Sequence, residues 1–249
     1  MKKVSIIMPM YNTEAFICDA IESVIVQTYT NWELLITDDC STDHSVEKVK
    51  EYAEKDNRIK LFSTHQKTGG PSEPRNISLS QATGELVAFL DSDDMWLPCK
   101  LQEQVDFMEK NGYTFIYSNV ERVSVDGVRS GRIDKRKVKT CYWDMLKVNQ
   151  IPSGSAMIVR EKITDVRYRP LPMEDFVFWL DILRKGGMAY NCGRTHMLYR
   201  VRPGSRSGSI VDKIKRQWYV LRDVEHLSFV RSAALMIPYL VNGFIRSLK

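Results

Sequence analysis

The stretch LVAFLDSDD, residues Leu86–Asp94, constrains the fold of this chain more than any other feature. Five apolar residues run without a break, and Asp91, Asp93 and Asp94 follow them. A short continuous apolar run bounded by turn residues is typical of a strand that is buried on both faces. Carboxylates crowded at the end of such a strand repel one another unless a cation or water neutralises them. The stretch therefore indicates either a divalent-metal site or a solvated turn that begins the next helix, and the spacing alone leaves both open.

Alternating strand and helix patterns surround this stretch and indicate an α/β fold. Strands are predicted at Val4–Met8, Trp32–Thr37 and Ile59–Ser63, and helices over residues 14–27 and 45–54. The order strand, helix, strand, helix, strand implies a mostly parallel sheet with right-handed crossovers. In such a sheet the carboxyl ends of neighbouring strands meet at one edge, where ligands bind.

The pattern changes after residue 112. Further helices are predicted over 75–82, 100–111 and 142–148, and strands at Tyr113–Asn119, Glu121–Val125, Ser155–Val159 and Met197–Val201. The basic segment 131–139 is predicted to be a surface loop. We expect one domain over residues 1–210, with halves 1–112 and 113–210, followed by a helical tail over 211–249.

Composition excludes several classes of protein. The chain has 249 residues, of which 43% are hydrophobic and 27% charged, so it can bury a full core. A net charge of +5 is too small to argue for nucleic acid as a partner. The five cysteines are scattered and form no C-x-x-C, which predicts reduced thiols in the cytosol rather than disulfides or a zinc cluster. Neither a signal peptide nor a membrane span is expected.

The tail has a composition of its own. Apolar residues recur at helical spacing from Ile214 to Leu227 with lysines and arginines between them, and residues 232–245 are uncharged and include Pro238, which is expected to interrupt the helix. One interpretation is an amphipathic helix that lies on a membrane surface. The other is a helical pair that packs on the domain or on a second subunit, which would allow a homodimer.

Three acidic clusters follow predicted strands or precede a helix: Asp38 with Asp39, Asp91 with Asp93 and Asp94, and Glu174 with Asp175. The segment 200–206 supplies Arg200, Arg202 and Arg206. Carboxylates for a cation and arginines for phosphate oxygens suit a metal–diphosphate complex. Neither G-x-G-x-x-G nor G-x-x-x-x-G-K-[ST] occurs in the sequence, so the common dinucleotide and phosphate-binding loops are not expected.

These pieces together resemble family 2 glycosyltransferases, which have the GT-A fold. The matching residues are VSIIMP with Tyr11-Asn12, DDCSTD at 38–43, Arg75-Asn76, LDSDD at 90–94, Glu174-Asp175 and Tyr199-Arg200, and they span residues 4 to 207. The resemblance is to bacterial enzymes that build teichuronic acid, O-antigen and capsule. It implies a mostly parallel central sheet flanked by helices, a nucleotide-sugar-binding half over 1–112 and an acceptor-binding half over 113–210.

The resemblance also implies roles in donor binding. Asp39 would pair with the uracil base, and Pro9 and Tyr11 would line the base pocket. Asp91 and Ser92 would lie near the ribose and the sugar. Asp93, with Asp91, would hold Mn²⁺ or Mg²⁺ against the diphosphate. Arg75 would contact the donor, and Tyr199 and Arg200 would belong to a loop that closes over the diphosphate.

Further roles concern the acceptor. Asp175 would be the general base, and Glu174 and Trp96 would contact the acceptor. Two departures from the family pattern stand out: Glu73-Pro74 replace small residues before Arg75, and Arg202 stands where many relatives have a histidine. His196 is nearby, but a lone histidine is more often structural.

The activity implied by the resemblance is inverting transfer of a hexose or N-acetylhexosamine from a UDP-sugar to a hydroxyl of a polyprenyl-diphosphate-linked glycan. The enzyme would be cytoplasmic and peripherally attached to the inner face of the bacterial membrane. Two alternatives stay open: a sugar-1-phosphate nucleotidyltransferase, and an inactive carbohydrate-binding scaffold. The sequence does not specify the sugar, the accepting hydroxyl or the polysaccharide.

Overall fold

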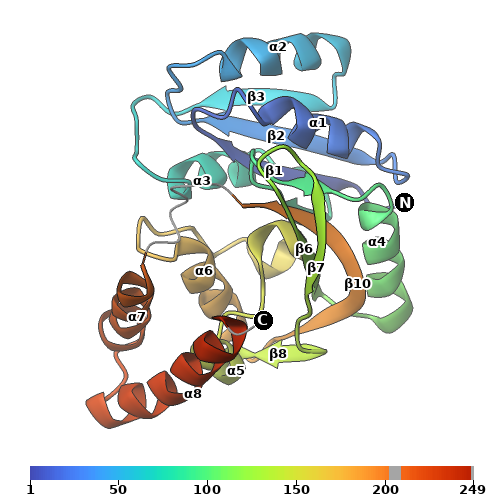
Figure 1. Cartoon of the computed structure of the whole chain (residues 1–249). Helices are drawn as coiled ribbons and strands as arrows, with labels where there is room; N and C mark the ends of the chain where they lie inside the picture. Colours follow the sequence, from blue (N-terminus) through green and yellow to red (C-terminus); the bar gives the residue numbers. More distant parts are fainter. Residues whose placement is uncertain (202–208, 248–249) are drawn as a thin grey trace.

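One large sheet organises the molecule, with helices on both of its faces (Figure 1). The computed structural model describes the backbone of residues 1–201 and 209–247 and the side chains up to residue 241. The sheet has ten strands in the order β3-β2-β1-β4-β9-β6-β10-β5, with β7 beside β6 and β8 beside β10. The predicted α/β class is therefore confirmed.

The elements of the first half are β1 (Val4–Met10), α1 (Ile17–Ile25), β2 (Trp32–Asp38), α2 (Ser45–Lys55), β3 (Ile59–Ser63), α3 (Ser72–Ser80), β4 (Leu86–Phe89), β5 (Met95–Trp96) and α4 (Lys100–Asn111). The elements of the second half are β6 (Phe115–Val123), β7 (Arg129–Asp134), β8 (Lys139–Cys141), α5 (Tyr142–Lys147), η1 (Ser153–Ser155), β9 (Met157–Val159), η2 (Arg160–Lys162), α6 (Glu174–Leu183), β10 (Met188–Arg200), α7 (Ile210–Tyr219), η3 (Val220–Val224) and α8 (Phe229–Ser247).

The first half of the sheet is parallel, as the alternating pattern predicts. Strands β3, β2, β1 and β4 pair in parallel, with Met10 opposite Asp38 and Ile7 opposite Phe89. All residues of β1, β2 and β4 are buried, which agrees with their continuous apolar runs. This register brings the chain segments that follow β1, β2 and β4 to one edge of the sheet.

The second half of the sheet is mixed. Strand β9 pairs antiparallel with both β4 and β6, whereas β10 pairs in parallel with β6. The predicted surface loop over 131–139 is wrong in part, because β7 and the start of β8 lie within it. Arg132 on β7 and Lys139 on β8 are exposed, so the charge of these side chains says little about whether the backbone is paired.

The tail helices pack against α5 and α6. Val220, Leu221 and Met236 are buried in the same core as α6. The Gln217 side chain donates a hydrogen bond to the Leu146 carbonyl at 2.9 Å. Helix α8 continues through Pro238, so the predicted interruption is wrong. Within the described ranges, no helix combines the length and the apolar character that crossing a bilayer requires.

Candidate active site

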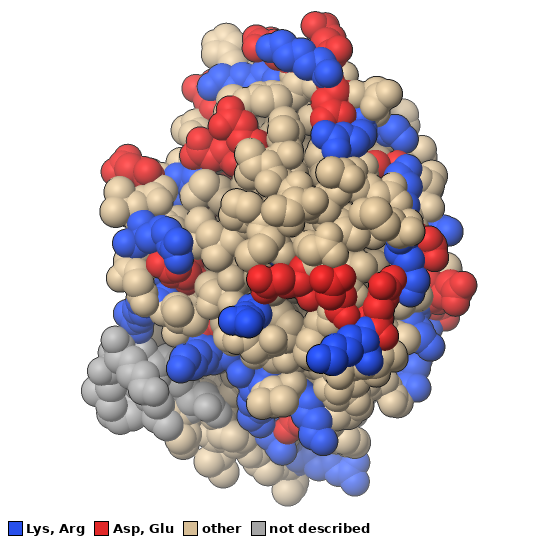
Figure 2. Space-filling view, turned by 90° about the vertical axis from the view of Figure 1, so that its right-hand side faces the viewer, with Lys and Arg blue, Asp and Glu red and all other residues tan. Residues whose placement is uncertain are grey.

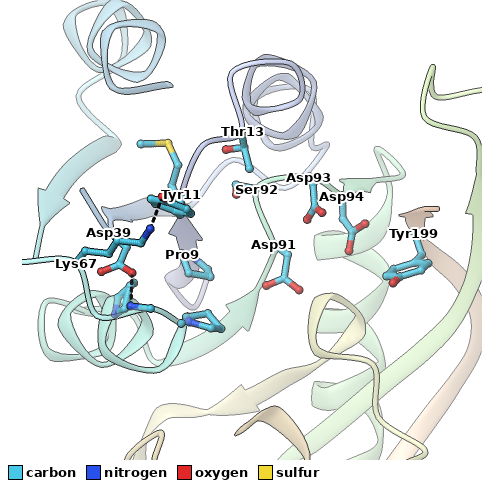
Figure 3. A pocket seen from close by; sticks show the side chains of 15 residues that line it. Pro9, Tyr11, Thr13, Asp39, Lys67, Asp91, Ser92, Asp93, Asp94 and Tyr199 are labelled. Atoms are coloured by element: carbon cyan, nitrogen blue, oxygen red, sulfur yellow. Dashed lines mark hydrogen bonds between the residues drawn. The ribbon is translucent and has the colours of Figure 1, made fainter. Parts of the chain in front are cut away.

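A pocket of about 550 Å³ lies at the carboxyl edge of β1, β2 and β4. Figure 3 shows Pro9, Tyr11, Asp39 and Lys67 on one side of it and the acidic turn with Tyr199 on the other. We use "acidic turn" for residues 91–94. The pocket thus joins three of the sequence segments that were predicted to meet here, namely those after β1, β2 and β4.

Asp39 is held by the loop that follows β3. Its Oδ1 accepts hydrogen bonds from the Thr68 backbone N–H at 2.8 Å and from the Thr64 hydroxyl at 3.1 Å. Its Oδ2 accepts one from the Gly69 backbone N–H at 3.1 Å. Asp39 is 3% exposed, yet it lines the pocket, so its carboxylate is fixed in place while one lone pair of Oδ2 remains for a further donor.

Tyr11 and Lys67 cover the same end of the pocket. The Lys67 ammonium donates a hydrogen bond to the Tyr11 hydroxyl at 2.6 Å, and Tyr11 is 37% exposed. Nearby, Asn12 and Cys40 have positive φ angles of 48° and 60°. Such backbone strain is found mainly where the surrounding structure must present particular groups.

All four residues of the acidic turn line the pocket, but they differ in exposure and in their partners. Asp94 is 2% exposed, and its Oδ1 accepts a hydrogen bond from the Arg200 backbone N–H at 2.9 Å. Asp91 is about one-third exposed and is ion-paired with Arg75 at 2.7 Å. Ser92 is buried but still lines the pocket, together with Asp93.

Arg75 connects the acidic turn to the start of α6. Its two terminal nitrogens donate to Asp91 Oδ1 at 2.7 Å and to Glu174 Oε1 at 3.1 Å. The side chain is 4% exposed and lies over the Tyr168 ring, with 5.0 Å between the guanidinium carbon and the ring centre. Arg75 itself is not among the residues that line the pocket, and its contact with the donor stays a prediction. Pro74 fits within the first turn of α3, so Glu73-Pro74 do not disturb this geometry.

Asp175 lies beside this ion pair, in the first turn of α6. Its Oδ1 accepts a hydrogen bond from the Phe176 backbone N–H at 2.7 Å. Burial, and then the neighbouring negative charge of Glu174, raise the pKa of Asp175 to about 6. A carboxylate with a pKa near the working pH is suited to general-base catalysis. Met173, which precedes the pair, has a positive φ of 59° and turns the chain sharply into the helix.

The burial of Trp96 and of Arg200 contradicts the roles that were predicted for their side chains. Trp96 is 2% exposed, donates to the Gly154 carbonyl at 2.8 Å and packs under the Lys100 ammonium, so it cannot stack on an acceptor sugar. Arg200 is 3% exposed, and its guanidinium is paired with Asp19 at 2.8 Å. The Arg200 side chain therefore holds the end of β10 and is not available to a diphosphate. Arg202 and Arg206 lie outside the described residues.

Sequence reasoning missed several pocket residues. Lys67, Gly69 and Gly70 belong to a segment without periodicity, which indicated only a loop. Met10 and Thr13 also line the pocket. Met10 is the last residue of β1 and Thr13 follows it closely, which could have suggested this, since β1 ends at the same edge of the sheet as the acidic turn.

The acidic turn is chemically suited to Mg²⁺ or Mn²⁺. Both ions prefer carboxylate oxygens, and Mg²⁺ is usually held by one or two carboxylates with substrate phosphate oxygens completing its shell. Asp91 and Asp93 both line the pocket and could supply such ligands.

Comparison with known proteins places this geometry in a family. The profile described as "Glycosyl transferase family 2" matches residues 5–180. The chain is 37% identical over 247 residues to the Escherichia coli UDP-Glc:alpha-D-GlcNAc-diphosphoundecaprenol beta-1,3-glucosyltransferase WfgD, covering 99% of this chain and 94% of the relative. It is 32% identical over 241 residues to TuaG of Bacillus subtilis (strain 168), whose name provisionally assigns it to teichuronic acid biosynthesis, covering 96% and 95%.

The fold agrees with this assignment. The crystal structure of S. aureus TarS 1-349 in complex with UDP-GlcNAc superimposes with a TM-score of 0.73 at 21% identity, covering 96% of this chain and 72% of TarS. This confirms the predicted GT-A fold. The family profile covers the pocket residues from Pro9 to Asp94 and the start of α6, and the chain is accordingly a glycosyltransferase that belongs to glycosyl transferase family 2.

Proposed function

We propose that the chain is an inverting hexosyltransferase that moves glucose from UDP-glucose to a hydroxyl of an N-acetylglucosamine that is linked to a polyprenyl diphosphate. The observation that carries the proposal is the Arg75 bridge, which joins Asp91 to Glu174 and sets Asp175 beside the acidic turn. Full-length similarity to WfgD supports glucose as the first donor to test. UDP-N-acetylhexosamines are the second choice.

The donor would lie across the pocket. The uracil N3–H would donate to the open lone pair of Asp39 Oδ2, and Pro9 and Tyr11 would flank the base. Lys67, which is near Tyr11, adds positive charge close to the nucleotide. The diphosphate and sugar would then reach Asp91 and Ser92, and Tyr199 would cover the far end.

Asp175 would perform the proton transfer. It takes the proton of the acceptor hydroxyl while that oxygen attacks the anomeric carbon from the face opposite UDP. The new bond to the acceptor forms as the bond to the UDP oxygen breaks, and the configuration inverts. UDP-glucose carries an α-anomeric carbon, so the product is a β-glucoside, which is the linkage named for WfgD. General-base help of this kind contributes about 10²- to 10⁴-fold.

A divalent cation held by Asp93 and Asp91 would neutralise the charge that grows on the leaving diphosphate. Glu174 would act through Arg75 and Asp175, since it is only 16% exposed and is ion-paired. We therefore propose that Glu174 positions Arg75 and Asp175, in place of the contact with the acceptor that was expected from the sequence.

The tail would bring the enzyme to its lipid-linked acceptor. Helix α8 exposes Phe229, Val230 and Ile237, and α7 carries the exposed Lys213 and Lys215. Apolar side chains next to lysines suit a membrane surface with anionic lipids. We therefore propose peripheral attachment at the cytoplasmic face of the membrane.

The test is UDP release from a panel of nucleotide sugars with a synthetic alkyl-diphosphate-linked N-acetylglucosamine as acceptor. We expect acceptor-dependent turnover of UDP-glucose that EDTA stops, and a loss of at least about 10²-fold in Asp175→Asn. Thr13→Ser, a mild change at the pocket wall, serves as the control variant. No turnover of any UDP-sugar in the presence of acceptor and Mn²⁺ would overturn the proposal and favour a scaffold without activity.

A further inference from the structure

A cluster of metal-ligating side chains lies outside the pocket, where α4 packs beside β10. One ligand atom each from Cys99, Glu103 and His196 lie within 4.8 Å of one another. Within the described ranges no other group of three or more histidine, cysteine or acidic side chains is this compact. The proposed transfer reaction gives these three residues no role.

The geometry of α4 places two of the three on one face. Cys99 directly precedes the helix and Glu103 follows one turn later, with the Glu103 backbone N–H donating to the Cys99 carbonyl at 3.0 Å. The start of this helix is fixed to β10, because the Leu97 backbone N–H donates to the His196 carbonyl at 2.9 Å. The His196 Nε2 lies 2.9 Å from Glu103 Oε2.

An irregularity in β10 completes the cluster. Residues four apart in a regular strand are separated by about 13 Å. Here the Cys192 Sγ lies only 3.5 Å from the His196 Nδ1. The register of β10 against β6 shifts between Asn191 and Thr195, and Gly193 has a positive φ of 75°. The strand thus bulges at this point and brings Cys192 next to the imidazole of His196, whose side chain is 1% exposed.

We infer that Cys99, Glu103 and His196 form a second cation site, for Zn²⁺ or a similar borderline ion. A thiolate, an imidazole nitrogen and a carboxylate are the donors that Zn²⁺ prefers, whereas Mg²⁺ prefers oxygen alone. Cys192 contacts the second ring nitrogen, where a partner fixes the orientation of a metal-bound histidine. Figure 2 shows a row of acidic side chains across the middle of the side of the molecule that is on the right in Figure 1, with basic side chains next to it.

A cation at this site would stabilise the packing of α4 against β10. It ties α4 to β10 only three residues before Tyr199, which lines the pocket. Glu103 is 43% exposed, so water can take the fourth position of a tetrahedral ion. We expect the ion to stabilise this end of β10 without taking part in glycosyl transfer.

The test is titration of the full chain with Co²⁺ and then Zn²⁺. Thiolate ligation gives Co²⁺ a charge-transfer band in the near ultraviolet, which carboxylates alone do not produce. We expect the band in the unchanged chain and in Asp93→Ala, and its loss in Cys99→Ser. The control is Cys141→Ser, since Cys141 also donates to a carboxylate, that of Asp144, at 3.5 Å. Zn²⁺ should displace Co²⁺, and Cys99→Ser should weaken Zn²⁺ binding at least about tenfold.

Thermal unfolding gives a second readout that does not depend on activity. Zn²⁺ should raise the melting temperature of the unchanged chain and of Cys141→Ser but not of Cys99→Ser. Three results would overturn the inference: no thiolate band, an unchanged band in Cys99→Ser, or binding that vanishes in Asp93→Ala. His196→Gln is a supporting variant, and Cys99→Ser decides alone if His196→Gln does not fold.

Discussion

Replacing Glu174 with glutamine should move the acid limb of the pH–activity profile to lower pH. Asp175 must be deprotonated to accept a proton, so kcat/KM should fall tenfold per pH unit below the Asp175 pKa of about 6. Burial is the larger cause of that raised pKa and the Glu174 charge is the next. Removing the charge should therefore lower the limb by ~0.5–1 pH unit, which corresponds to ~0.7–1.4 kcal/mol.

The sign of this shift does not depend on which neighbour dominates. Without the Glu174 charge, Arg75 has one carboxylate fewer to neutralise, and its positive charge also lowers the pKa of Asp175. The two effects act in the same direction. Neither reactant interferes near pH 6, because the diphosphates of the donor and of the lipid-linked acceptor are both diesters.

The assay is kcat/KM for UDP release between about pH 4.5 and about pH 8.5, with saturating Mn²⁺. Glu73→Gln is the control. Glu73 is exposed on α3, so this substitution also removes one negative charge, but not from a neighbour of Asp175. We expect the limb to move in Glu174→Gln only. An unmoved limb, or a limb that moves to higher pH, would refute the assignment of that limb to Asp175.

Four further predictions test other parts of the structure. Asp39→Asn should weaken UDP binding, measured by calorimetry, by about 10- to 100-fold, because an amide cannot accept the same hydrogen bonds; a change under twofold would contradict the role of Asp39. Trp96→Phe should lower the free energy of unfolding by about 1–2 kcal/mol through a lost buried hydrogen bond and leave the acceptor KM unchanged, whereas a raised KM would restore the stacking hypothesis. Ile237→Asp should reduce sedimentation with anionic vesicles, and the equally exposed Val128→Asp should not; equal losses would remove the tail from membrane binding. Lys100→Met should raise the free energy of unfolding most at and below pH 7, because burial lowers the pKa of Lys100 in the folded chain to about 7. Between that pH and the unfolded pKa of 10.5, only the unfolded state holds the proton, so the gain should shrink by up to about 1.4 kcal/mol per pH unit. Denaturant unfolding of both proteins at several pH values measures this, and a constant difference would contradict a buried amine.

The parallel half of the fold could be predicted because one rule governs it. Continuous apolar runs such as Leu86–Leu90 occur where both faces of a strand are covered, and their order along the chain then dictates the sheet. The second half follows no such rule. Strand β7 is an exposed edge strand whose basic side chains gave no signal, and β10 bends at Gly193, which local propensity does not encode.

The candidate site was predictable where it depends on strand ends and unpredictable where it depends on burial. Asp39 and Asp91 follow buried strands, so the topology alone brings them to one pocket. Trp96 comes two residues after the acidic turn and Arg200 directly follows the pocket residue Tyr199, yet the side chains of Trp96 and Arg200 are buried in the protein. The orientation of each side chain depends on a partner that is distant in the sequence, Gly154 for Trp96 and Asp19 for Arg200. A local sequence pattern does not predict such partners.

The ion pairs of Arg75 with Asp91 and Glu174 make the geometry of the pocket depend on a residue that does not line it. The guanidinium is almost fully buried, so its charge is tolerable only while Asp91 and Glu174 both face it. A donor or cation that drew Asp91 Oδ1 away from Arg75 would break that ion pair. Donor binding on one side of Arg75 would then strengthen its hold on Glu174 on the other and lower the pKa of Asp175. Asp175 would thus be deprotonated, and able to accept the proton of the acceptor hydroxyl, once the donor is in place.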